Sequence, residues 1–331
     1  MQLRNLYRVP SAVLAAVLMF TALWSGFPAG TGEKKGNNAE RSTEKQGMSV
    51  FVSILPQKYF VERITGGHAE VSVMVPPGKS PATYDPSPRQ VTSLGGADIF
   101  FTIGVPFERS FLPTVRDNLS GVDFVDTSEE IERHSIQSAI ESVEADHAEA
   151  DDAGDDHDHG HEHGHGVENP DPHIWLSPPL VEKQVRTMLE ALVAHAPGQE
   201  DSFRENFRAF VEDLQELDEE LHRILEPVKG SPLLVYHPAF GYFAKNYGLS
   251  QIPIELGGDE PTPKQLQKII SLAKRKGVKV IFVQPEFSTS SARRVAEAID
   301  GAVVEVAPLK PNYLENMRII AEDIRRGLAG E

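Results

Sequence analysis

Residues 200–228 read EDSFRENFRAFVEDLQELDEELHRILEPV, and this stretch decides how the chain is organised. Its large apolar side chains recur every three or four residues, the period of one helix face. They are Phe203, Phe207, Phe210, Val211, Leu214, Leu217, Leu221 and Leu225. A helix of roughly seven to eight turns spans about 40 Å, enough to run along one lobe and cross to the next. The stretch predicts a stiff connector between two halves, although an ordinary surface helix would show the same pattern.

Short apolar segments rich in β-branched and aromatic residues alternate with amphipathic segments on both sides of this helix. The strand-like segments are 49–55, 69–76, 98–105 and 121–128 in the first half and 232–237, 250–256, 278–285 and 302–308 in the second. Alternating strands and helices predict βα units with parallel sheets, and therefore an α/β protein of two lobes. We place the first lobe at residues 48–196, the connecting helix at 197–228 and the second lobe at 229–331.

The amino terminus indicates secretion. Arg4 and Arg8 precede an apolar run over residues 9–27, which turns to small and polar residues at 28–30. This pattern predicts a signal peptide over residues 1–30, in preference to a retained anchor, because Pro10 and Ser11 shorten the uninterrupted run. A disordered polar spacer is expected over 31–47. The sequence has no cysteine, so no lipid-modified cysteine follows the signal, and we expect a free periplasmic protein.

A polar loop over residues 144–168 contains the segment DDHDHGHEHGH. Its histidines are His157, His159, His161, His163 and His165. Imidazole binds zinc, copper and nickel, and the interleaved glycines let a loop wrap around an ion, so the tract predicts metal collection. The alternative is a solvated acidic loop with incidental histidines. The loop holds ten of the acidic residues behind the net charge of −17, which favours a cationic ligand and argues against nucleic acid as a partner.

Two further histidines are candidates for a fixed site. His173 lies in ENPDPHIWLSP just before a helix, and His237 lies where a strand ends and a helix begins. Ligands of open α/β sheets bind beyond the carboxyl ends of strands, which favours His237. Either histidine alone could simply be packed in the fold, but the His-rich loop ends close to His173 and favours metal binding. Four other scattered histidines are interpreted as surface residues: His68, His134, His195 and His222.

Six motifs occur in a specific order along the chain: VPPGKSPATYDPSPRQ (75–90), ADIFFTIGVPFE (97–108), DPHIWLSP (171–178), VYHPAFGYFAKNYGL (235–249), EPTPKQL (260–266) and VIFVQPEFS (280–288). This order resembles the metal-binding solute-binding proteins of ABC importers, of the ZnuA/TroA type. The resemblance implies a TroA-like, class III binding-protein fold, in which one long α-helix joins two lobes with four-stranded parallel sheets. It also implies a monomer without enzymatic activity, which captures a divalent metal ion between the lobes and delivers it to a membrane permease.

Only some of the family's metal ligands have a counterpart in this sequence. His173 and His237 match two metal ligands of the family. Ala82 stands where members usually have a ligand histidine, and Ala307 stands where many have a ligand aspartate. Glu286, after the VIFVQP strand, is the nearest substitute for a third ligand. Possible accessory groups are Tyr84, Asp85 and the loop histidines.

The residues available favour Zn²⁺ over Mn²⁺, because manganese prefers more carboxylate oxygen than these motifs supply. In the family, a His-rich loop also accompanies zinc more often than manganese. One alternative is a zinc-dependent hydrolase with an open water position at His173, His237 and Glu286. No HExxH helix carries these residues and no separate general base is apparent, and HEHGH at 161–165 fits the HExxH letters only within the glycine-interrupted polar loop. Another is a metal-binding adhesin or a metal buffer on the same lobes.

Overall fold

The computed structural model describes residues 47–136, 169–255 and 260–331. The predicted signal peptide, nearly all of the predicted spacer and the loop histidines lie outside these ranges. Among the described residues, no helix has the length and apolar character needed to cross a membrane.

Eight short strands form two four-stranded sheets, in which all neighbouring strands are parallel. The first sheet has the order β2-β1-β3-β4 and consists of β1 (Met48–Val52), β2 (Ala69–Val73), β3 (Ile99–Thr102) and β4 (Asp123–Asp126). The second has the order β6-β5-β7-β8 and consists of β5 (Pro232–Val235), β6 (Ser250–Pro253), β7 (Val280–Val283) and β8 (Ala302–Glu305). The predicted fold class, with two four-stranded parallel sheets, is confirmed.

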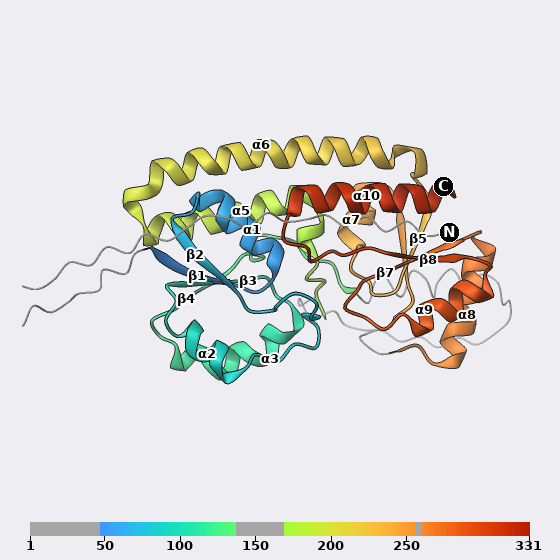
Figure 1. Ribbon diagram of the computed structural model, residues 1–331, viewed down its shortest axis with the longest axis horizontal. Coiled ribbons are helices and arrows are strands. Elements are labelled where there is room, and N and C mark those ends of the chain that lie inside the picture. Colours follow the sequence, from blue (N-terminus) through green and yellow to red (C-terminus); the bar gives the residue numbers. More distant parts are fainter. Residues whose placement is uncertain (1–46, 137–168, 256–259) are drawn as a thin grey trace, which may run out of the picture. The chain divides into compact units, whose positions relative to one another are not determined.

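The helices of the first half are α1 (Leu55–Thr65), α2 (Pro88–Leu94), α3 (Pro106–Val115) and α5 (Pro178–His195). Those of the second are α7 (Gly241–Asn246), α8 (Pro263–Arg275), α9 (Ser290–Ala298) and α10 (Tyr313–Ala329). Between them runs α6 (Glu200–Leu225), a helix of 26 residues and therefore about 39 Å long. Figure 1 shows α6 passing over the helices of both halves, with α5 and α10 beside it. Short 3₁₀ turns flank it at Pro197–Gln199 and Glu226–Val228, so the predicted connecting helix is present.

The second sheet is buried on both faces, as a parallel sheet between helices should be. Alternate residues of its central strands enter different cores. Leu233 of β5 and Phe282 of β7 pack into the large core that includes α6, whereas Leu234 and Ile281 face a smaller core formed with α8 and α9. This alternation explains why the strands read as continuous apolar runs rather than as one-sided patterns.

The apolar stripe of α6 belongs to a single core that reaches both sheets. Every predicted member of the stripe except the partly buried Val211 is buried. On one side α6 packs against α1, and on the other against α10. The ring of Phe60 in α1 meets the ring of Tyr313 in α10 edge to face, with centroids 5.0 Å apart. The helix layer therefore ties the first sheet to the second through direct side-chain packing.

A buried polar network closes the carboxyl ends of the first sheet. Glu108 of α3 accepts hydrogen bonds from Ser53 Oγ at 2.5 Å and from the backbone N–H groups of Ile103 and Gly104 at 3.1 and 2.7 Å. Burial raises the pKa of Glu108 to about 7, against the lowering effect of these hydrogen bonds. Gly104 has a φ of 85°, and a Cβ there would overlap the guanidinium of Arg133. The network thus fixes the turn that leads from β3 into α3.

Truncation of a buried side chain in the α6 stripe should destabilise the whole fold. Leu217 is fully buried, so Leu217→Ala should lower the free energy of unfolding by about 2–5 kcal/mol. The matched control is Glu216→Ala at the exposed neighbouring position, which should change it by less than about 0.5 kcal/mol. Urea unfolding followed by circular dichroism measures both, and equal midpoints for the two variants would contradict a core role for the stripe.

Candidate metal centre

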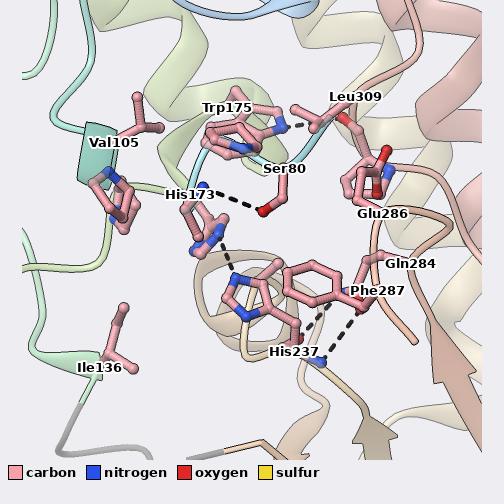
Figure 2. Close-up of a pocket in the computed structure, with 16 residues that line it drawn as sticks. Ser80, Val105, Ile136, His173, Trp175, His237, Gln284, Glu286, Phe287 and Leu309 are labelled. Atoms are coloured by element: carbon pink, nitrogen blue, oxygen red, sulfur yellow. Dashed lines mark hydrogen bonds between the residues drawn. The ribbon is translucent and has the colours of Figure 1, made fainter. Parts of the chain in front are cut away.

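Two histidines from different halves of the chain point their rings at each other. His173 precedes the 3₁₀ turn Ile174–Leu176 that leads into α5, and His237 follows β5. Their Nε2 atoms lie 3.3 Å apart, as the dashed line in Figure 2 marks. Two nitrogen ligands of a tetrahedral zinc ion, each about 2.0–2.1 Å from the metal, are separated by about 3.3–3.4 Å. The spacing of the two Nε2 atoms therefore matches a pair of ligands on one ion.

A carboxylate holds the far nitrogen of each ring. Asp171 Oδ1 lies 2.6 Å from His173 Nδ1, and Glu255 Oε2 lies 2.9 Å from His237 Nδ1. Because an ionised carboxylate only accepts hydrogen bonds, each Nδ1 must carry the proton and donate it. In a neutral ring the Nε2 atom is then left with its lone pair exposed. This is the carboxylate–histidine arrangement that orients zinc ligands and raises their basicity.

The electrostatics favour a cation between the two rings. Lone pairs that face each other at this distance repel unless a positive charge lies between them. Burial lowers the pKa of His237 below its usual value, and this effect outweighs the opposing effect of the hydrogen bond that its Nδ1–H donates to Glu255. His237 therefore stays neutral and able to bind a metal at pH values where an exposed histidine would begin to take up a proton.

Aromatic rings and backbone contacts fix the orientation of both histidines. Phe287 stacks on His237, with centroids 4.5 Å apart and planes 21° from parallel, and Trp175 lies 5.1 Å from His173. Gln284 accepts a hydrogen bond from the N–H of His237 and donates one to its C=O. The indole N–H of Trp175 donates to the carbonyl of Pro308 beyond β8. The rings are therefore held in place before any ligand arrives.

Local chain geometry explains how the two carboxylates reach their partners. Asp171 Oδ1 also accepts the backbone N–H of His173 at 2.9 Å, so the Asp-Pro-His segment forms a tight side-chain-to-backbone turn. Glu255 comes just after β6, the neighbour of β5, and its N–H donates to the carbonyl of Tyr236. Since parallel strands end at the same edge of a sheet, Glu255 and His237 emerge side by side.

The two histidines face a cavity of about 60 Å³. A cavity of this volume has room for an ion with a few waters. Its wall is mainly apolar and includes Val105, Ile136, Trp175, Phe287 and Leu309, several of which Figure 2 labels around the histidines. An apolar wall limits solvent access and strengthens charge interactions inside the cavity.

The other predicted site residues are not gathered at the histidines. Glu286 and Ala82 line the same cavity, but among the described residues no three His, Asp or Glu side chains converge closely enough to hold an ion. Burial raises the pKa of Glu286. The hydroxyl of Tyr84 donates to Gln90, and Asp85 is exposed and does not line the cavity. The histidines of the loop lie outside the described residues.

Sequence reasoning did not identify Asp171 and Glu255. A signal was present for both, because Asp171 lies two residues before His173 and Glu255 ends a strand-like segment beside the one that ends at His237. Recognising Glu255 also required the strand order, which the sequence pattern alone does not supply.

Comparisons with known proteins identify the family of the chain and agree with its fold. A sequence profile described as "Zinc-uptake complex component A periplasmic" (ZnuA) matches residues 50–327. The high-affinity zinc uptake system protein ZnuA of Bacillus subtilis is 28% identical, over 89% of this chain and 85% of that protein. The manganese-binding lipoprotein MntA of Halalkalibacterium halodurans is 27% identical, over 83% of this chain and 81% of that protein.

A solved structure extends the likeness to the fold. The crystal structure of a ZnuA has a TM-score of 0.74 at 32% identity, and the match covers 85% of this chain and 99% of that one. The profile match spans both sheets, α6 and both histidines of the candidate metal centre. The chain therefore belongs to the ZnuA family of periplasmic zinc-uptake components.

Proposed function

We propose that this protein captures Zn²⁺ outside the cytoplasm and delivers it to the permease of an ABC importer. The observation that carries the proposal is the pair of carboxylate-backed imidazoles whose Nε2 atoms lie 3.3 Å apart and face one cavity. The family is described as periplasmic, and we propose the same location for this protein. We also propose that a cleaved signal peptide over residues 1–30 directs its export.

Zinc is the proposed cargo because both fixed ligands are nitrogens. Imidazole suits zinc, whereas manganese prefers carboxylate, carbonyl and water oxygens. Some relatives are named for zinc and others for manganese, so their names do not decide between the two metals. The assignment of zinc therefore depends on the ligands of this chain. For a bare ion, Glu286 on the cavity wall is the proposed third protein ligand, with water or the accessory groups Tyr84 and Asp85 completing the set.

The site is better suited to binding than to hydrolysis. A zinc hydrolase needs a general base beside the metal-bound water. The two carboxylates nearest the histidines, Asp171 and Glu255, are engaged by the Nδ1 atoms of the rings. We therefore propose a monomeric transport component without enzymatic activity and without a nucleic-acid partner. No feature of the described residues specifically favours an adhesin or a metal buffer.

Removal of either imidazole should weaken zinc binding strongly. His173→Ala and His237→Ala each remove one coordinate bond, so we expect zinc affinity to fall by roughly a hundredfold or more, as measured by competition with a fluorescent zinc chelator. Asp171→Asn and Glu255→Gln keep an oxygen beside Nδ1 but remove the charge, and should cost about ten- to a hundredfold. His68→Ala, at an exposed position away from the cavity, is the control. Parent-like affinity in both histidine variants would refute the assignment.

A third imidazole at the cavity wall should tighten binding. Ala82 lines the cavity that both histidines face, so Ala82→His places a nitrogen ligand where the chain now has a methyl group. We expect zinc affinity to rise by at least about tenfold in the same competition assay. Ala82→Gln, of similar size but without imidazole, is the matched control. An unchanged or lower affinity in Ala82→His would mean that this wall is built around a different ligand.

The His-rich loop is proposed to collect extra zinc near the cavity. The described residues on either side of it are held together near the cavity that Ile136 lines, because Ser135 pairs with Pro170 in an antiparallel bridge and Arg109 donates to Asn169 and to the Pro170 carbonyl. Histidine and acid side chains interleaved with glycine should bind zinc weakly and release it readily.

Deletion of residues 146–166 should lower the number of zinc ions bound per chain and leave the tightest site intact. Equilibrium dialysis with metal analysis gives the count, and chelator competition gives the affinity of the tightest site. If the deletion abolishes that site, a loop histidine supplies a ligand and the loop is part of the metal centre.

A further inference from the structure

A second cavity adjoins the metal centre. It has a volume of about 370 Å³, against about 60 Å³ for the smaller cavity, and it shares Glu286 and Leu309 with that cavity. Its wall combines the turn after β2 with the segments that follow β7 and β8. The space beside the histidines is therefore much larger than a zinc ion requires.

Charged groups of both signs line this second cavity. Lys79 comes from the turn after β2 and Lys310 from the segment after β8, whereas Glu286 and Glu305 supply carboxyl groups. Within the described part of the chain, neither lysine has an ion-pair partner. A molecule with both an amino group and a carboxylate would find a complementary partner for each.

The metal centre has few donors on the side of the second cavity, where Glu286 is the one carboxylate that lines both cavities. A zinc ion usually takes four ligands, and the two imidazoles supply two. Ala82 lines the first cavity and Ala307 lines the second, so both walls present methyl groups. A small chelator with one nitrogen and one oxygen donor would fill both vacant positions at once, while the rest of it occupied the larger space.

We propose that the preferred cargo is zinc held by a small acidic amino acid, with the chelator seated in the second cavity. Its amine nitrogen and one carboxylate oxygen complete the coordination begun by His173 and His237. The coordinated amine donates to Glu286, and the second carboxylate lies against Lys79 and Lys310. Glu286 then holds the chelator instead of serving as a ligand of the bare ion. The inference rests on the proposed zinc-binding function.

The test is equilibrium dialysis of the metal-free chain with radiolabelled L-aspartate, with and without one equivalent of zinc. We expect about one L-aspartate per chain in the presence of zinc and none in its absence. At a fixed free zinc concentration, added L-aspartate should raise zinc occupancy. L-alanine, which has the same amine and carboxylate but no second acid, should bind more weakly in the ternary complex.

Variants locate the chelator. Lys79→Ala combined with Lys310→Ala should weaken zinc-dependent L-aspartate retention by roughly tenfold or more, without changing zinc binding alone or L-alanine retention. Retained zinc binding also shows that the variant is folded. Lys268→Ala, on an exposed part of α8 that lines neither cavity, is the matched control and should behave like the parent.

The outcomes separate the two proposals. If zinc binds at the histidines but L-aspartate is not retained, or if the lysine pair has no effect on its retention, the chelate proposal is overturned and zinc capture stands. If His173→Ala and His237→Ala both bind zinc as tightly as the parent, the proposed function itself fails.

Discussion

The metal centre depends on the packing of α6 against α1 and α10. His173 and His237 come from different halves of the chain, so their distance is set by the placement of one sheet relative to the other. That placement is maintained by one apolar core, into which α6 contributes a stripe of buried side chains along its length. A close-packed core resists small displacements, and a ligand pair tolerates only a few tenths of an ångström. The long helix thus determines the geometry of a site to which it contributes no ligand.

Charge balance explains why the groups behind the two histidines are carboxylates. A divalent ion in a cavity with apolar walls loses most of its hydration and needs compensating charge nearby. Neutral imidazoles provide none, but the carboxylates of Asp171 and Glu255 behind them provide two negative charges. The ion, two imidazoles and two carboxylates together are formally neutral. Binding therefore places no uncompensated charge in the interior.

The sequence was sufficient for the fold because its signals are local. The eight strands are short apolar runs and α6 is a long periodic stripe, and each pattern can be recognised without knowing its neighbours. His173 and His237 could be identified from the motifs around them. The role of Glu255 could not, since it depends on β6 lying next to β5.

The limit of sequence reasoning is clearest at Glu286. It follows β7 and lines the cavity, but whether its carboxylate reaches a metal, as predicted, depends on tenths of an ångström in three dimensions. Among the described residues, no third His, Asp or Glu side chain joins the two Nε2 atoms closely enough to hold an ion. The sequence pattern predicts at which edge of a sheet a side chain lies. Whether that side chain coordinates a metal depends on how the two lobes pack.

The position of Trp175 beside His173 has a spectroscopic consequence. The chain has two tryptophans, and the other, Trp24, lies in the predicted signal peptide. In a protein that begins at Met48, all indole emission comes from a buried ring whose centroid is 5.1 Å from a metal-binding imidazole. A change of charge at that imidazole alters the electric field across the indole. The state of the site is therefore readable as fluorescence, without any attached label.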